Sequence, residues 1–186
     1  MNSPLSVPKS LIIEIQKNLI NSKQDSNPLV CLGSDSSLDS FELRKYNDIL
    51  YLLPRFASNA LLENNSWKWD VNTQINIPTG SLSSKSSRGK GIAINFITDL
   101  LEIKGRSGKE RCQPFGRNRS QSIKKLLQEY SVPPWIRDRL PIIYIGNEIA
   151  AVADLWVCKD FQAKAGNHGL VINWSDNVYS NLHTRR

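Results

Sequence analysis

The chain has 186 residues, of which 40% are hydrophobic and 22% charged, a composition typical of a folded protein of one or two small domains. Its net charge is +7, and no run approaches the roughly 18 apolar residues that a membrane-spanning helix needs. The amino terminus has no basic region followed by an apolar stretch, and the three cysteines are widely spaced. We therefore expect a cytoplasmic protein with reduced thiols, without membrane association and without a disulfide framework or a zinc site.

The amino-terminal part is predicted to form a small module over residues 1–54, the first of three segments. Apolar residues at helical spacing predict one amphipathic helix, and short apolar runs predict three strands. These elements are expected over residues 9–21, 29–32, 41–46 and 49–53. Asn47 and Asp48 separate the last two strands, which is the two-residue spacing of a β-hairpin.

Residues 55–103 are predicted to be a β-rich connecting region. Trp67 and Trp69 lie two residues apart and so share one face of a strand, with Ile75 and Ile77 on a neighbouring strand. The segment 78–91 is rich in serine, glycine and lysine, and we expect it to be an exposed loop. Further strands are expected over 92–96 and 100–103.

Residues 104–186 are predicted to form a strand-rich domain with one main helix. The helix is expected to begin after Ser120 or Ser122, either of which can cap it, and to end near Tyr130. Pro133 and Pro134 prevent its continuation. Strands are expected over 142–145, 148–152 and 170–174. The sequence as a whole therefore predicts an α+β fold in two small modules, a helix plus hairpin followed by the strand-rich domain.

The positive charge is concentrated in one segment. Residues 104–125 contain eight lysines and arginines and only one acidic residue, Glu110, whereas the flanking segments are each neutral. Such a concentration favours a polyanionic partner, because it raises the electrostatic potential over a limited surface. The alternative is a solvated, flexible basic loop.

The sequence contains no complete catalytic motif. Gly105–Lys109 resembles a phosphate-binding loop, but Ile103 stands where that motif needs its first glycine, and Glu110 where it needs a serine or threonine. His168 and His183 do not have the spacing of metal ligands. We therefore predict no catalytic residues, no metal site and no cofactor in this chain.

The basic segment and the residues after its helix form the candidate binding site. Arginine grips phosphate through two parallel hydrogen bonds, and lysine acts as a mobile point charge, so their mixture suits an RNA backbone. Contacts of this kind give affinity and not sequence specificity. Trp135 either anchors the helix end in the core or stacks on a base. The predicted RNA-binding residues are Arg111, Arg117, Arg119, Lys124, Lys125, Arg137 and Arg139.

Several stretches resemble the tRNA(Ile)-lysidine synthetase family. The carboxy-terminal domain of that family is resembled by Ser122–Glu129, Val132–Trp135, Arg137–Arg139 and Pro141–Tyr144. Glu42–Tyr46, with Leu50–Leu52, resembles the end of the family's middle, substrate-binding domain, and Pro78–Gly80 the connecting region. One departure is Ala153-Asp154-Leu155, where the family commonly has a glycine before the apolar residue.

The resemblance implies the carboxy-terminal portion of an enzyme that uses ATP and magnesium to attach lysine to the wobble cytidine of the CAU anticodon of an isoleucine tRNA. The family's ATP-binding Ser-Gly-Gly-x-Asp-Ser loop does not occur in this sequence. We therefore expect this chain to bind tRNA and to be inactive alone, with a separate catalytic domain as a further partner. The alternatives are a non-enzymatic nucleic-acid-binding protein derived from such a domain, and a membrane-surface or protein-interaction module that uses the same basic patch.

Overall fold

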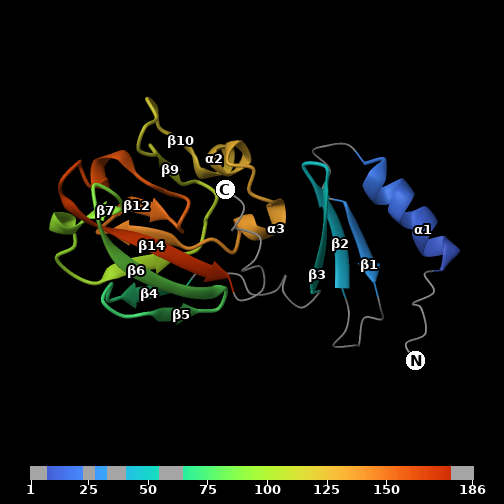
Figure 1. The fold of residues 1–186 in the computed structure, drawn as a ribbon, viewed down its shortest axis with the longest axis horizontal. Helices are drawn as coiled ribbons and strands as arrows, with labels where there is room; N and C mark the ends of the chain where they lie inside the picture. Colours follow the sequence, from blue (N-terminus) through green and yellow to red (C-terminus); the bar gives the residue numbers. More distant parts are fainter. Residues whose placement is uncertain (1–7, 23–27, 33–40, 55–64, 177–186) are drawn as a thin grey trace. The chain divides into compact units, whose positions relative to one another are not determined.

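The computed structural model describes residues 8–22, 28–32, 41–54 and 65–176. The chain divides into two compact units, Met1–Asn59 (unit 1) and Ala60–Arg186 (unit 2), and each is described by itself. Figure 1 shows their helices and strands. The predicted α+β class is confirmed, because strands predominate and short helices accompany them in both units.

Unit 1 consists of a helix and a three-stranded antiparallel sheet. The helix α1 (Lys9–Ile15) continues as a π-helical turn, and the sheet has the order β1 (Leu29–Leu32), β2 (Phe41–Tyr46) and β3 (Ile49–Pro54). Asn47 and Asp48 have φ values of 47° and 59°, as the tight turn of a twisted hairpin requires. The predicted helix, strand and hairpin are confirmed.

The first sheet of unit 2 has five strands, in the order β13-β12-β11-β8-β4. Their bounds are Ser66–Trp69 (β4), Leu101–Lys104 (β8), Ile142–Ile145 (β11), Glu148–Val152 (β12) and Trp156–Val157 (β13). All its pairings are antiparallel. Leu101 and Ile103 of β8 and Ile142 and Ile143 of β11 are fully or almost fully buried. Burial of these apolar side chains holds the sheet in the core.

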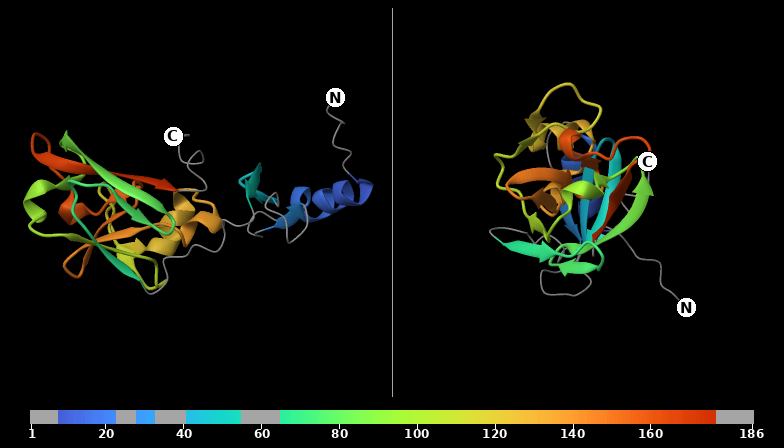
Figure 2. Two further views of the ribbon diagram at one scale, coloured as in Figure 1. Left: turned by 90° about the horizontal axis from the view of Figure 1, so that it is seen from below. Right: turned by 90° about the vertical axis from the view of Figure 1, so that its left-hand side faces the viewer.

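The second sheet of unit 2 has four strands, in the order β5-β6-β14-β7. Their bounds are Ile75–Ile77 (β5), Gly80–Arg88 (β6), Ile92–Ala93 (β7) and His168–Asp176 (β14). The long strands β6 and β14 lie side by side along the unit, paired from Gly80 and Asp176 to Arg88 and His168 (Figure 2).

This second sheet corrects three expectations. The predicted exposed loop 78–91 is wrong, because most of it is strand β6. Its serine-rich sequence has weak strand propensity, and pairing with β14 overrides that preference. Ile75 and Ile77 pair with β6 and not with the strand of Trp67 and Trp69. Only Ile92–Ala93 of the strand expected over 92–96 is extended, since Ile94–Phe96 forms a 3-10 turn.

Two short strands and two helices complete unit 2. The strands β9 (Arg111–Cys112) and β10 (Gln121–Ser122) pair as a narrow antiparallel ribbon. Helix α2 (Ile123–Glu129) follows at once, and a turn leads to the one-turn helix α3 (Pro134–Arg137). The predicted cap is confirmed, because the Ser122 hydroxyl accepts a hydrogen bond from the Lys125 amide at 3.4 Å.

A buried ion pair connects the end of α3 to the second sheet. The Arg139 guanidinium donates two hydrogen bonds to the Asp176 carboxylate, from Nε at 2.8 Å and from Nη2 at 3.1 Å. Nη2 also lies 3.4 Å from the carbonyl oxygen of Thr79, next to the start of β6. Both charged side chains are 1% exposed or less. The pair therefore connects the segment after α3 to both β6 and β14.

Residues 65–103 and 104–176 belong to one unit. The expected boundary between residues 103 and 104 falls inside β8, and β4 and β8 share a sheet with β11. The structure therefore contains no separate connecting region over the described part of 55–103. Of the helices formed by the described residues, none is long and apolar enough to cross a membrane.

Candidate nucleic-acid interface

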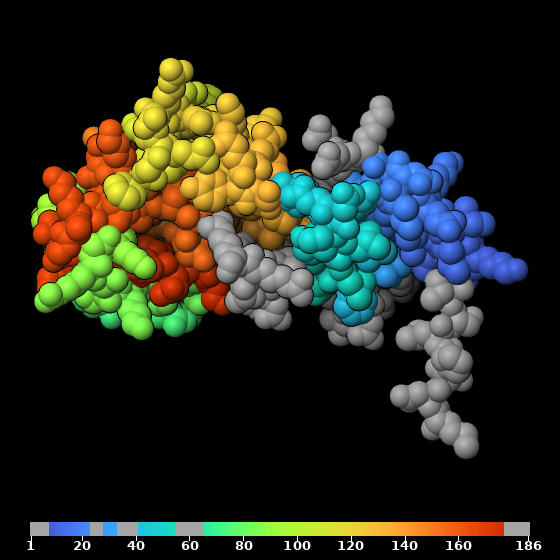
Figure 3. All heavy atoms as spheres, turned by 45° about the horizontal axis from the view of Figure 1, so that its top comes forward, coloured from blue at the N-terminus to red at the C-terminus, as the bar shows by residue number. Residues whose placement is uncertain are grey.

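The ribbon of β9 and β10, its loop and helix α2 carry most of the positive charge. We call residues 109–125 the basic ribbon. The loop between β9 and β10 projects from unit 2 in both views that show it (Figures 1 and 2), and the space-filling view shows the yellow residues of this region standing out from the surface (Figure 3). Ile123, Leu126 and Leu127 anchor α2 in the core, and so Lys124 and Lys125 are turned to solvent.

Four of the eight cations in 104–125 have acidic neighbours. Lys104 contacts Glu102 at 2.8 Å, and the Arg106 guanidinium, whose side chain is only 10% exposed, contacts Asp138 at 2.9 Å. Arg117 and Lys125 both face Glu129, at 3.3 Å and 4.0 Å. These pairs neutralise part of the charge that the sequence concentrates in this segment.

The other four cations, Lys109, Arg111, Arg119 and Lys124, are exposed and form no ion pair with any residue that the structure describes. The Arg111 side chain donates to the carbonyl oxygen of Ser120 at 3.1 Å, which connects β9 to the end of the loop. All four lie on the ribbon, on its loop or on the first turn of α2. They are the cations best placed to meet phosphate groups.

The loop of the ribbon is held by polar and aromatic contacts. The Gln113 side chain donates to the carbonyl oxygen of Arg117 at 2.6 Å. The Arg117 guanidinium lies 6.0 Å from the centre of the Tyr130 ring, which is itself 4.8 Å from the Trp156 ring. Because Trp156 is buried, this stack connects an exposed loop arginine to the core. These contacts hold the charged loop against the rest of unit 2.

The segment that resembles a phosphate-binding loop is occupied by its own carboxylate. The backbone amides of Ser107 and Gly108 donate to the Glu110 carboxylate, the second at 2.9 Å. Burial raises the pKa of the Glu110 carboxyl, but these amide hydrogen bonds outweigh it and lower the pKa below its ordinary value. The amides that would cradle a phosphate are therefore engaged by a permanent internal anion.

A cleft of about 480 Å³ lies beside the ribbon and contains two buried thiols. Cys112 on β9 and Cys158 after β13 both line it. The thiol of Cys158 is hydrogen-bonded to Cys112, which lowers the pKa of Cys112 and raises that of Cys158. Neither cysteine is in a disulfide, and the described residues contain no group of three or more side chains that could hold a metal ion.

Arg137 and Arg139 lie outside the basic ribbon, at the end of α3 and two residues beyond it. Arg137 is half-buried, and its Nε donates to the carbonyl oxygen of Val132 at 2.8 Å, across the turn between α2 and α3. Assigning Arg139 to the RNA-binding site is wrong on structural grounds, because its guanidinium is buried and paired with Asp176. An arginine without solvent access cannot reach a phosphate backbone. The other five predicted residues, Arg111, Arg117, Arg119, Lys124 and Lys125, lie together on the ribbon.

A second surface feature is absent from the sequence-based prediction. A groove of about 800 Å³ runs between the loop of the ribbon, the 3-10 turn after β7 and the turn before β14. We call it the Phe115 groove. The residues on its wall that bear on binding are Phe96, Phe115, Lys159, Lys164, Asn167 and His168. They come from three distant segments, and no periodicity or spacing in the sequence connects them.

Comparisons with known proteins agree with the family resemblance. Residues 101–174 match the family described as the TilS substrate C-terminal domain. The tRNA(Ile)-lysidine synthase of Coxiella burnetii is 32% identical over 161 residues, which cover 84% of this chain and 33% of that protein. The synthase of Methylococcus capsulatus is 28% identical over 173 residues, covering 90% of this chain and 37% of that protein. The chain thus spans about a third of the length of these relatives.

A solved structure, described as the crystal structure of the TilS C-terminal domain, matches with a TM-score of 0.48 and 16% identity. The match covers 61% of this chain and 98% of the solved one. The stretch that resembled the carboxy-terminal domain of the synthetase family, from Ser122 to Tyr144, lies inside the matched segment 101–174. The resemblance is therefore confirmed, and the chain carries the C-terminal domain of the tRNA(Ile)-lysidine synthase family.

Proposed function

We propose that this chain is the tRNA-binding, carboxy-terminal portion of a tRNA(Ile)-lysidine synthase, and that the basic ribbon is its phosphate-binding surface. The observation that carries the proposal is the group of four exposed cations that form no ion pair with any described residue: Lys109, Arg111, Arg119 and Lys124. Phosphate oxygens would supply the negative charge that the fold does not provide there. The ribbon's partner would be the sugar–phosphate backbone of tRNA.

In the whole enzyme, ATP and magnesium would activate the wobble cytidine of tRNA(Ile), and lysine would then be attached to it. The role of this chain would be to hold the tRNA while that chemistry proceeds in another domain. The loop backbone would lose little freedom when the tRNA docks, because the Gln113 hydrogen bond and the contact of Arg117 with Tyr130 already hold it. The interaction would fix the position of the tRNA without reading its bases.

Salt dependence tests the proposal. Each phosphate neutralised by a cation releases condensed counterions, and so log affinity should fall against log salt by about 0.7 to 0.9 per contact. Four contacts predict a slope of roughly −3 to −4, measured by fluorescence anisotropy with labelled tRNA(Ile). A nearly flat dependence would show that the ribbon is a solvated surface and not a phosphate site. Because the ribbon would read no bases, other folded tRNAs should bind with similar affinity, whereas equal affinity for double-stranded DNA would favour a general nucleic-acid-binding protein.

The chain by itself should be catalytically silent. The Ser-Gly-Gly-x-Asp-Ser loop does not occur in the sequence, and the amides of Ser107 and Gly108 are already engaged by Glu110. We expect no pyrophosphate release when the purified chain is mixed with ATP, magnesium, lysine and tRNA(Ile), followed with a coupled pyrophosphate assay. Lysine-dependent release above the rate of a heat-denatured sample would contradict this prediction.

A further inference from the structure

Phe115 is an exposed aromatic side chain in a charged loop. It is 63% exposed, more than any other large hydrophobic residue among those that the structure describes. Water contact over a phenyl ring is unfavourable, and a single exposed apolar residue needs no explanation by itself. Phe115, however, lies on the wall of the groove of about 800 Å³, and its backbone amide is hydrogen-bonded there.

The backbone from Gln113 to the Phe115 amide is held to β13 and the segment after it. The Phe115 amide donates to the carbonyl oxygen of Val157 at 2.9 Å, and the Lys159 amide donates to the carbonyl oxygen of Gln113 at 2.8 Å. Gly116 follows with a φ of 82°, a left-handed conformation that glycine adopts readily, and it turns the chain directly after the ring. The fold therefore holds the Phe115 ring in solvent, where it adds no buried apolar area to the hydrophobic core.

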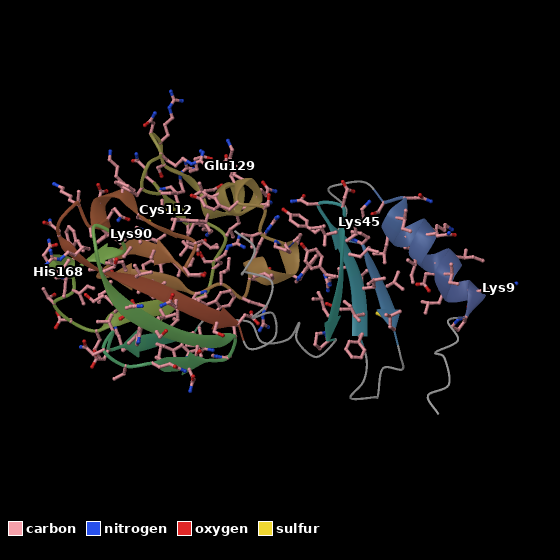
Figure 4. The ribbon with its side chains drawn as sticks, in the orientation of Figure 1. Lys9, Lys45, Lys90, Cys112, Glu129 and His168 are labelled. Carbon is pink, nitrogen blue, oxygen red and sulfur yellow. The ribbon has the colours of Figure 1, made fainter. Side chains whose placement is uncertain are left out.

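Other residues that line the groove provide a second aromatic ring and positive charge. Phe96 is 38% exposed and is held by an edge contact with Phe161, with ring centres 5.2 Å apart at 69°. Lys159 and Lys164 are exposed and line the groove, against one acidic residue, Asp160. Figure 4 shows His168, another lining residue, at the side of unit 2 away from Glu129 of helix α2, so the groove lies apart from that helix.

An aromatic wall beside lysines is the arrangement by which proteins hold single-stranded nucleic acid: bases stack on rings while cations follow the phosphates. A volume of about 800 Å³ is within the range of sites that take small organic molecules, nucleotides included. We propose that the Phe115 groove binds an unpaired nucleotide of the RNA held by the basic ribbon, with its base stacked on Phe115. The proposal rests on the proposed function, because the same RNA must lie on the ribbon.

The two surfaces then divide recognition between them. The ribbon holds phosphates of a duplex, and the groove holds a base that pairing leaves free. A loop, a bulge or a single-stranded end adjoining a duplex would engage both surfaces, whereas a blunt duplex would engage the ribbon alone. Stacking is tolerant of base identity, since every base has a π-face, and so the groove distinguishes unpaired from paired RNA rather than one sequence from another.

The test compares two labelled RNAs, a short blunt duplex and the same duplex with a single-stranded 3′ overhang, at one salt concentration. Wild-type protein should bind the overhang RNA more tightly. Phe115→Ala should weaken binding of the overhang RNA by about fivefold or more and leave the blunt duplex within about twofold, whereas Phe115→Trp should retain the preference. Leu100→Ala is the matched control, because Leu100 is 55% exposed and does not line the groove, and both affinities should stay unchanged.

The possible failures are distinct. If wild-type protein binds neither RNA, the proposed function itself is wrong. If it binds both RNAs equally and Phe115→Ala changes nothing, the proposed function stands and the stacking inference is overturned. Equal weakening of both RNAs by Phe115→Ala would assign the ring to the structure of the loop, and it would also overturn the inference. Circular dichroism of each variant confirms that the fold is intact.

Discussion

Replacing Asp176 by alanine is expected to lower the free energy of unfolding of the domain by about 3–5 kcal/mol, because the Arg139 guanidinium would remain buried without its counter-charge. Small domains are stable by only about 5–15 kcal/mol, so this loss is a large share of the total. Urea denaturation followed by tryptophan fluorescence measures the change. The magnitude follows from leaving a buried charge unpaired and is much larger than the net stabilisation that the intact pair provides.

A double variant distinguishes the cost of an unpaired charge from that of lost packing. Arg139→Met combined with Asp176→Leu removes both charges and should be less destabilised than Asp176→Ala alone. Asp154→Ala is the control for an exposed aspartate and should change stability by less than about 0.5 kcal/mol. A loss below about 1 kcal/mol in Asp176→Ala would mean that water reaches the Arg139 guanidinium.

Reversing the charge of Arg119 and Lys124 together, as Arg119→Glu and Lys124→Glu, is expected to weaken tRNA binding by roughly 25- to 60-fold at about 0.1 M monovalent salt. Each phosphate contact contributes about five- to eightfold there through counterion release, and the variant loses two. The slope of log affinity against log salt should become shallower by about 1.5 to 2. Fluorescence anisotropy over a salt series measures both quantities.

The matched control has the same change in net charge on a different surface. Lys68 on β4 and Lys85 on β6 are exposed, and replacing both by glutamate should weaken binding by less than about threefold, through the general field alone. Its salt slope should match that of the wild type. If both double variants lose the same affinity, tRNA responds to net charge only, and the basic ribbon is not a discrete site. Exposed charges contribute little to stability, so both variants should remain folded.

Helix ends and tight turns that depend on a few neighbouring residues were predicted correctly from the sequence. The Ser122 cap, the two prolines after α2 and the residue pair Asn47-Asp48 each act within a few residues, and the structure confirms all three. Strand β6 could not be predicted in this way. Its serines and lysine have low strand propensity, and its pairing partner β14 lies far along the chain.

The candidate site was predicted only in part, because some of its features depend on contacts between segments that are distant in the sequence. Arg137 and Arg139 cannot be distinguished from the local sequence. Arg139 is buried in an ion pair with Asp176, and Asp176 lies far along the chain, so only the fold brings the two together. The positions of the ribbon cations followed from charge counting, whereas the carboxylates that neutralise some of them did not. Glu129 lies one turn after Lys125 on the same helix, and the i, i+4 rule for helical ion pairs could have identified that pair. The Phe115 groove depends on three distant segments and was beyond any local rule.

The pairing of β6 with β14 also determines which residues a polypeptide must include in order to fold, and how fast it folds. Gly80 pairs with Asp176 and Ser66 of β4 pairs with Lys104, so β14 and β8 both have partners outside the segment 101–174 that defines the family match. A polypeptide restricted to 101–174 would expose both edges of β14 and one edge of β8, and such edges promote aggregation. Closing the long loop between β6 and β14 has an entropic cost before their hydrogen bonds form, which slows folding. Slow but reversible refolding is therefore expected only in chains that begin no later than Ser66 and extend through Asp176.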